Sequence, residues 1–194
     1  EWQENSLELL EQKLVKETKN SKILALGEIG LDFWNGREEL EEQLDIFSQQ
    51  LLLAQRLNLP VILHNRKGWP DFFSTMKNLR ISELSGVCHH FTGSKQIAAQ
   101  LLDMGLYISF CGPLTYESAK KLHKLAEYVP LERILTETDS PDLPPAAKRN
   151  EQSRPWMVKE IVEKIADLKK IKMETVQLNI ANNWQRLFQA NRLQ

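Results

Sequence analysis

Short apolar segments alternate with longer amphipathic helical patterns along most of this chain. Apolar runs bounded by polar residues predict strands at residues 22–26, 61–63, 86–88, 106–110 and 133–135. The clearest helix is predicted at residues 37–57, where apolar residues recur on one face and Glu and Gln occupy the other. Strand and helix alternate about five times, which favours an α/β fold with a parallel sheet.

The length and composition favour a single globular domain over residues 1–194. Of the 194 residues, 42% are hydrophobic, so the chain can bury a sizeable core. The formal net charge is −1, so no overall basic field attracts nucleic acid, and any such binding has to be local. We expect no stable protein partner.

Cys88 and Cys111 are the only cysteines, and their spacing suggests neither a disulfide framework nor a zinc knuckle. Both lie in apolar, strand-like runs, so we expect free thiols in the core, as in a reducing cytoplasm. The sequence has no apolar run long enough to cross a membrane. We therefore expect a cytoplasmic protein that does not bind a membrane.

Acidic or imidazole side chains follow four of the predicted strands. Glu28 comes directly after the first strand, and His64, His89 and Asp139 follow later ones. Because residues at the carboxyl ends of parallel strands converge at one edge, these four can meet if the strands lie side by side. Carboxylate oxygen and imidazole nitrogen suit zinc, manganese, iron or magnesium. The pattern therefore predicts a metal site.

Two glycines flank Glu28 in the sequence. Gly27 and Gly30 allow either a turn of the backbone or the close approach of another group. Their spacing does not fit a dinucleotide-binding loop, so a nucleotide-cofactor sheet is disfavoured.

Each predicted ligand also has a structural interpretation. Glu28 could be a salt-bridged carboxylate, His64 a neutral core histidine and Asp139 the first residue of a turn. His89 and His90 are adjacent, so on a strand their side chains would point to opposite faces, and at most one would face a given site. The four residues together are a stronger signal than any one of them, because each has the same topological position.

The remaining histidine, His123, lies among Lys120, Lys121 and Lys124. We expect it on the exposed face of a helix rather than in a site.

Four motifs occur along the chain in a defined order. They are Gly27-Glu28-Ile29-Gly30-Leu31-Asp32, Pro60-Val61-Ile62-Leu63-His64-Asn65-Arg66, His89-His90-Phe91-Thr92-Gly93-Ser94 and Glu137-Thr138-Asp139-Ser140-Pro141. In order and spacing they resemble the signatures of the TatD family of metal-dependent deoxyribonucleases. Residues 183–188 also look like part of that family's C-terminal helix. The resemblance implies a (β/α)8, TIM-barrel-like metal-dependent hydrolase with two divalent metals at the C-terminal face of the barrel.

The resemblance also implies roles for individual residues. Glu28 looks like the carboxylate that bridges two metals, and His64 and His89 look like ligands of one metal. Asp139 looks like a ligand that also holds or deprotonates the attacking water, so Glu28 and Asp139 are the expected catalytic residues. The expected ions are Mg²⁺, Mn²⁺ or Zn²⁺, and His90 is left without a role.

Basic and amide side chains are candidates for contacts with phosphate. Arg66, Arg149 and Asn150 fall where the family meets phosphate, and the alternative for them is solvated surface charge. Glu137 would point to the same side as Asp139 if the strand continued, and it could support the ligands by hydrogen bonding.

The sequence departs from the family pattern in one respect. The family opens with a strand that ends in a His-x-His pair, and this sequence contains no such pair. The five predicted strands are also about three fewer than a closed barrel needs. We therefore expect the chain to correspond to the C-terminal part of a TatD-like barrel, with about the first three βα units absent.

The leading functional hypothesis is a divalent-metal-dependent hydrolase that cleaves phosphodiester bonds of DNA with a metal-activated water. Because the His-x-His pair is missing, we expect the chain alone to be weakly active or inactive. One alternative is hydrolysis of a small-molecule ester, amide or phosphoester by the wider amidohydrolase superfamily. The other is an inactive, truncated barrel.

Overall fold

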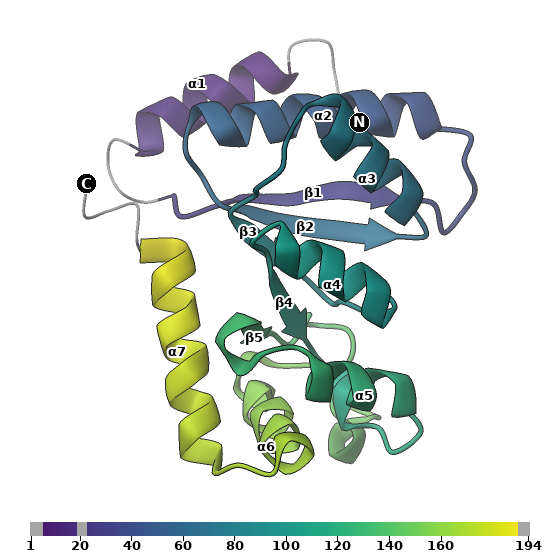
Figure 1. Ribbon diagram of the computed structural model, residues 1–194, viewed down its shortest axis with the longest axis vertical. Coiled ribbons are helices and arrows are strands. Elements are labelled where there is room, and N and C mark those ends of the chain that lie inside the picture. The colour runs from purple at the N-terminus through teal and green to yellow at the C-terminus, as the bar shows by residue number, and fades with distance from the viewer. Residues whose placement is uncertain (1–5, 19–22, 190–194) are drawn as a thin grey trace. The chain divides into compact units, whose positions relative to one another are not determined.

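The computed structural model describes residues 6–18 and 23–189 (Figure 1). These residues form two compact units, and each is described by itself. Unit 1 extends to Gly86 and includes residues 187–189, whereas unit 2 covers Val87–Arg186.

Two parallel strands and three helices make up unit 1. The strands are β1 (Leu26–Asp32) and β2 (Val61–Arg66), and the helices are α1 (Ser6–Thr18), α2 (Leu40–Arg56) and α3 (Trp69–Asn78). Leu26 pairs with Val61 at the start of the two strands, and Asp32 pairs with Arg66 at their end. Helix α2 packs on β1 and helix α3 on β2, while α1 and α2 lie on the same side of the two strands (Figure 1).

The core of unit 1 forms between these helices and strands. Helix α2 buries Phe47, Leu51 and Ala54, which come from the apolar face expected from the sequence, and also Leu53. The Phe47 ring lies 5.8 Å from the ring of Phe72 in α3. This aromatic contact joins the two helices above the strands.

The first strand begins later than its sequence predicted. The expected strand covered residues 22–26, but β1 runs from Leu26 to Asp32; residues 23–25 have no regular structure, and Lys22 lies outside the described residues. The register with β2 shifts between Gly27 and Ile29, which interrupts the alternation of buried positions, and the alternation is regular from Ile29 onward. Glu28 therefore lies inside the strand instead of following it. The strand extends past Glu28 because residues 29–32 pair with β2.

The strands of unit 2 are β3 (Gly86–Cys88), β4 (Tyr107–Phe110) and β5 (Ile134–Thr136). They are parallel: Val87 pairs with Tyr107, and Ile108 pairs with Ile134. The helices of the unit are α4 (Lys95–Asp103), α5 (Lys120–Tyr128), α6 (Val158–Lys169) and α7 (Met173–Gln189). Four short 3₁₀ segments complete it: η1 (Gly112–Thr115), η2 (Leu131–Arg133), η3 (Ala146–Lys148) and η4 (Pro155–Met157).

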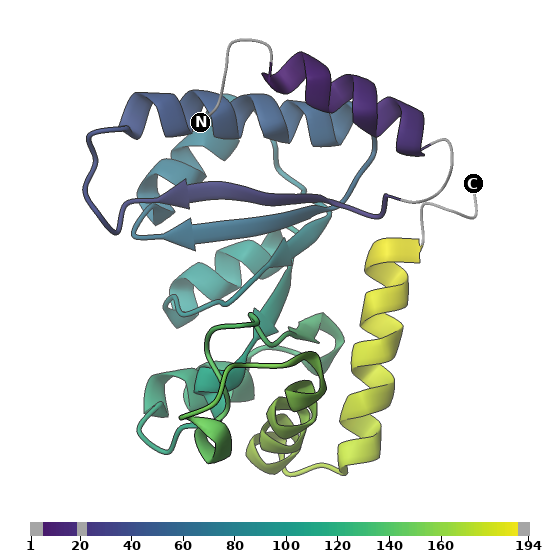
Figure 2. The ribbon, with the colours of Figure 1, turned by 180° about the vertical axis from the view of Figure 1, so that it is seen from behind.

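A side-chain hydrogen bond explains where helix α4 of unit 2 begins. The Ser94 side chain accepts a hydrogen bond from the Ile97 N–H at 3.2 Å, which caps the start of α4. Every residue of β4 is buried, as expected for a parallel strand covered on both faces. Figure 2 shows the long, mostly irregular connection from β5 to α6, which carries Asp139.

The parallel α/β fold predicted from the sequence is confirmed in the described residues, which contain five strands. Cys88 and Cys111 are buried free thiols, as expected. No helix among the described residues is both long enough and apolar enough to span a bilayer.

The prediction for His123 is wrong. Its side chain is buried, and its Nε2 lies 3.0 Å from the carbonyl oxygen of Leu114 in η1. The lysines around it in sequence suggested an exposed face. In the helix, however, Lys120, Lys121 and Lys124 are exposed while His123 lies on the buried side with Leu125 and Ala126, and a carbonyl group satisfies the imidazole there.

Candidate metal centre

Glu28 and His64 lie next to each other on the paired strands of unit 1. The Oε2 atom of Glu28 is 3.9 Å from Nδ1 of His64. The other ring nitrogen of His64, Nε2, lies 2.9 Å from Oδ2 of Asp32. His64 is half-buried and Glu28 is exposed, so a carboxylate and an imidazole nitrogen face the same accessible space. Two of the four predicted ligands are thus neighbours within this unit.

Gly30 allows the two strands to approach at this point. A side chain at residue 30 would put its Cβ 1.8 Å from the backbone oxygen of His64, and the residue has a φ of +151°. Gly27 approaches Ile62 of β2 in a similar way. Of the two roles considered for these glycines, the structure confirms close approach of another group.

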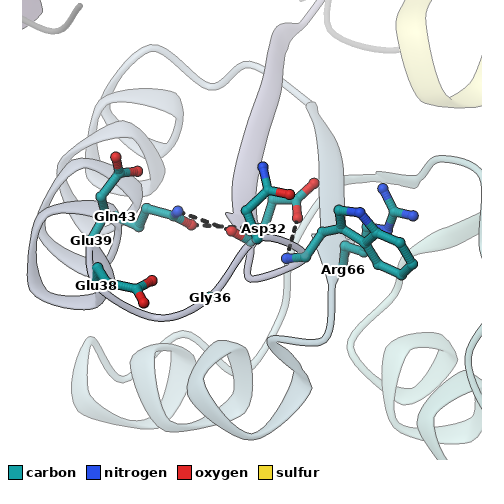
Figure 3. Close-up of a pocket in the computed structure, with 8 residues that line it drawn as sticks. Asp32, Gly36, Glu38, Glu39, Gln43 and Arg66 are labelled. Atoms are coloured by element: carbon teal, nitrogen blue, oxygen red, sulfur yellow. Dashed lines mark hydrogen bonds between the residues drawn. The ribbon is translucent and has the colours of Figure 1, made fainter.

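Asp32 is a residue of the site that the sequence reasoning did not select. The backbone N–H of Trp34 donates to its Oδ1 at 2.8 Å. The Gln43 side chain binds the backbone of Asp32 through two hydrogen bonds, of 2.9 and 3.0 Å (Figure 3). The sequence signal that could have identified Asp32 is its position four residues after Glu28, at the end of the same strand.

Hydrogen bonding and charge stabilise the ionised form of Asp32. Burial by itself would raise the pKa of this carboxyl group. The Trp34 N–H and the neighbouring His64 outweigh that effect and hold the pKa below its ordinary value of 3.8. Asp32 is therefore a carboxylate at neutral pH that accepts a hydrogen bond from His64.

In unit 2, His89 directly follows β3 and is buried. Its Nδ1 lies 3.8 Å from Oε2 of Glu137. The backbone N–H of His90 donates a short hydrogen bond to Oε1 of the same carboxylate. Glu137 thus contacts the histidine turn, as expected for a supporting residue, although β5 ends at Thr136.

Asp139 lies beside His90, the histidine that received no role from the sequence. Its Oδ2 atom is 3.6 Å from Nδ1 of His90. Both residues have positive φ values, +42° for His90 and +52° for Asp139, so the backbone turns sharply at each. The turn after β3 and the turn after β5 thus present a second carboxylate–imidazole pair.

The three predicted phosphate contacts have different surroundings. The guanidinium carbon of Arg66 lies 3.7 Å from the ring centroid of Trp34, and that of Arg149 lies 5.1 Å from the ring of Tyr116. Asn150 is exposed in the turn that follows η3. Only Arg66 shares an element with a predicted metal ligand, because it follows His64 in β2.

Parallel strands with carboxylate–imidazole pairs at or near their carboxyl ends are typical of α/β enzymes. The chain belongs to the family described as TatD related DNase, whose model matches residues 1–189. This match does not support the expectation that the first three βα units are absent.

Individual relatives agree with this assignment. The chain is 35% identical over 190 residues to the uncharacterized metal-dependent hydrolase YabD of Bacillus subtilis, covering 96% of this chain and 74% of that protein. It is 38% identical over 174 residues to the uncharacterized metal-dependent hydrolase YcfH of Escherichia coli K12, covering 89% of this chain and 66% of that protein. The crystal structure of YjjV, a TatD homologue from Escherichia coli K12, has a TM-score of 0.88 and 32% identity, covering 97% of this chain and 71% of that one.

Proposed function

We propose that this protein is a divalent-metal-dependent hydrolase that cleaves phosphodiester bonds of DNA. The family to which it belongs is named for DNases, and two of its relatives are named metal-dependent hydrolases. The observation that carries the proposal is the pairing of His64 with Glu28 on one ring nitrogen and with Asp32 on the other. The proposal includes the (β/α)8 barrel that the family resemblance implies.

The surroundings of His64 fit a metal ligand. Histidines that bind metals usually donate their second ring N–H to a carboxylate, which selects the tautomer and the ring orientation. With Nε2–H donated to Asp32 Oδ2, the lone pair of His64 remains on Nδ1, on the side of Glu28. His89 also has a carboxylate neighbour, Glu137, whose Oε2 lies 3.8 Å from its Nδ1.

The proposed ligands are Glu28, His64, His89 and Asp139, with Mg²⁺, Mn²⁺ or Zn²⁺ as the ion. When bound, a divalent ion would activate water as a Lewis acid and neutralise charge on the phosphoryl oxygens. Glu28 and Asp139 would supply oxygen ligands, and His64 and His89 would supply nitrogen ligands. Asp32 and Glu137 would hold the two imidazole rings in position.

Asp139 is also the proposed general base. An Oδ atom would accept the proton of the attacking water as the water oxygen bonds to phosphorus, while the P–O ester bond breaks and the displaced sugar oxygen takes up a proton from solvent. His90 lies beside it, with Nδ1 3.6 Å from Oδ2. Arg66, Arg149 and Asn150 would bind the substrate's phosphate groups.

The test is cleavage of fluorescently labelled DNA with added Mg²⁺ or Mn²⁺, compared between the wild type and Asp139→Asn. We expect the substitution to reduce cleavage by about 100-fold or more. Asp142→Asn is the matched control, because Asp142 is an exposed carboxylate three residues further along the same loop. Equal cleavage by the wild type and Asp139→Asn would refute the assignment of Asp139.

Metal binding is measured separately by calorimetry. We expect His64→Ala to weaken Mn²⁺ binding about tenfold or more relative to the wild type. A wild-type protein that binds neither Mn²⁺ nor Zn²⁺ would favour the inactive-barrel alternative. Metal-dependent hydrolysis of small esters or amides without cleavage of DNA would favour the superfamily alternative.

A further inference from the structure

Two cationic side chains lie against one exposed tryptophan in unit 1. The guanidinium carbon of Arg66 is 3.7 Å from the ring centroid of Trp34, and Nζ of Lys67 is 4.3 Å from it. Trp34 is 54% exposed, although tryptophan usually buries most of its surface. We propose that Arg66 and Lys67, positioned by Trp34, form a clamp for a phosphate group of the substrate. The identity of that phosphate rests on the proposed function.

An unfavourable backbone conformation at Lys67 brings the two cations to the same ring. Consecutive residues of a strand normally point to opposite faces. Lys67, which directly follows β2, has a φ of +61°, a left-handed conformation that is unfavourable for a residue with a long side chain. This conformation turns the chain out of the strand and lets Lys67 reach the ring that Arg66 already covers.

Neither cation forms a close ion pair. Among the residues that the structure describes, no carboxylate oxygen lies within 4.0 Å of the charged nitrogens of Arg66 or Lys67, although the charge of Arg66 contributes to the lowered pKa of Asp32. Arg37, on the same loop as Trp34, differs in this respect, because it forms a 2.8 Å salt bridge with Asp71. Two cations that contact one aromatic ring and form no close ion pair suit a phosphate group, whose oxygens accept charge-assisted hydrogen bonds from both guanidinium and ammonium groups.

The neighbouring pocket restricts where an anion can bind. A pocket of about 320 Å³ is lined by Arg66 and Trp34 as well as by the carboxylates of Asp32, Glu38 and Glu39. Figure 3 shows Glu38 and Glu39 on the Gln43 side of Asp32, away from Arg66. Glu38 and Glu39 repel a phosphate from their side of the pocket. An anion would therefore bind at the opposite side, where Arg66 and Trp34 lie.

The clamp is connected to the candidate metal ligand in two ways. His64 and Arg66 are two residues apart on β2, so their side chains lie on the same face, about 6–7 Å apart along the strand. The Trp34 N–H donates to Asp32, which itself binds His64. A phosphate held by the clamp would thus lie beside His64, at about the spacing between successive phosphates of a nucleic acid strand.

Binding is tested with the full chain and a fluorescein-labelled single-stranded oligonucleotide, by anisotropy in EDTA at several salt concentrations. We expect Arg66→Gln and Lys67→Gln each to weaken binding roughly tenfold. Each should also reduce the slope of log affinity against log salt by about 0.7, the value for one lost phosphate contact. Lys77→Gln is the matched control, because Lys77 is an exposed cation of the same unit with no aromatic support.

A second set of variants isolates the positioning role of Trp34. Trp34→Leu leaves the net charge unchanged and should weaken binding about threefold or more, whereas Trp34→Tyr keeps an aromatic face and should retain most of the affinity. The control is Trp156→Leu, since Trp156 is a 68% exposed tryptophan of unit 2. Wild-type affinity in Trp34→Leu would overturn the positioning role, and Arg66→Gln or Lys67→Gln behaving like Lys77→Gln would overturn the clamp.

Two features of the design separate this inference from the proposed function. Binding in EDTA is read without cleavage, so equal cleavage by the wild type and Asp139→Asn would refute the catalytic assignment and leave the clamp standing. Inorganic phosphate is added as a competitor to identify the ligand. If millimolar phosphate displaces the oligonucleotide, the clamp recognises a single phosphate group. If the oligonucleotide stays bound, the clamp requires the nucleic acid backbone. A wild-type protein that binds neither probe overturns the clamp.

Discussion

The Nε2 atom of His64 lies 2.9 Å from the Oδ2 atom of Asp32 across the paired strands β1 and β2. With Nε2 bound to Asp32, Nδ1 is the ring nitrogen of His64 that faces Glu28, at 3.9 Å from its Oε2. Asp32 is in turn held by the Trp34 N–H and, through its backbone, by the Gln43 side chain of α2. A chain of contacts therefore extends from helix α2 to the proposed metal ligand.

The first prediction concerns this hydrogen bond. Asp32→Asn keeps the shape of the side chain but removes its charge, so His64 loses a carboxylate partner. We expect Mn²⁺ affinity, measured by calorimetry, to fall about 10- to 100-fold, as for other carboxylates that orient a metal-binding histidine. The control is Asp45→Asn on α2, where the lost hydrogen bond to Gln49 is exposed. Unchanged affinity in Asp32→Asn would contradict the orienting role.

A second prediction concerns the approach of β1 to β2 at Gly30. In Gly30→Ala the new Cβ would lie 1.8 Å from the backbone oxygen of His64, and alanine is disfavoured at a φ of +151°. We expect the free energy of unfolding in urea to decrease by about 2–4 kcal/mol. Gln55→Ala, at an exposed position of α2, should change it by less than about 0.5 kcal/mol. An equally small effect for Gly30→Ala would show that the strands can separate at this point without cost.

A third prediction concerns the two buried thiols. Burial, reinforced by the charge of Glu137, raises the pKa of Cys88 and of Cys111 above the ordinary value of 9.0. Above pH 9 the thiols of the unfolded chain ionise while those of the folded chain stay protonated. Stability should therefore be independent of these groups below pH 9, and then fall by up to about 1.4 kcal/mol per thiol for each further pH unit.

This pH dependence is measured by urea unfolding between pH 8 and pH 10.5. The double variant Cys88→Ala/Cys111→Ala is the control, and it should show a smaller decline over the same range. Thiol titration with a disulfide reagent at pH 8 should be slow in the folded protein and rapid in denaturant. Rapid reaction in the folded state would contradict the burial of both groups.

A fourth prediction concerns Asn183 on α7. Its side-chain amide donates to the carbonyl oxygens of Leu131 and Ile134, at 2.9 and 2.8 Å, and so attaches the helix to the start of β5. Asn183→Ala leaves two carbonyl groups without this donor, and we expect a loss of about 1–3 kcal/mol in urea unfolding. Asn179→Ala removes one exposed hydrogen bond on the same helix and serves as the comparison. Equal losses in the two variants would exclude a special role for Asn183.

Much of the fold could be predicted because burial of apolar side chains acts locally along the sequence. The apolar face of residues 37–57 predicted helix α2, and short apolar runs predicted β2 to β5 to within a few residues. The first strand was less accurate, because two glycines and Glu28 interrupt its pattern, and only pairing with β2 shows that it extends to Asp32.

The candidate site also has a part that could be predicted from the sequence and a part that could not. Residue types and their positions after strands were enough to select Glu28, His64, His89 and Asp139 as ligand candidates, because carboxylates and imidazoles are costly at strand ends without a partner. The partners themselves could not be predicted. Asp32 beside His64, Glu137 beside His89, His90 beside Asp139 and the inward orientation of His123 depend on distances between side chains.

The order of strands, helices and chemically active residue types is therefore a property of the amino-acid sequence, since each follows from local patterns of polarity. Only the folded structure shows that Nδ1 of His64 faces Glu28 while Nε2 contacts Asp32. Only the folded structure shows that Arg66 and Lys67 share the ring of Trp34. The physical reason is that hydrogen bonds and cation–π contacts depend on separations of a few ångströms between residues that can be more than 30 positions apart in the chain.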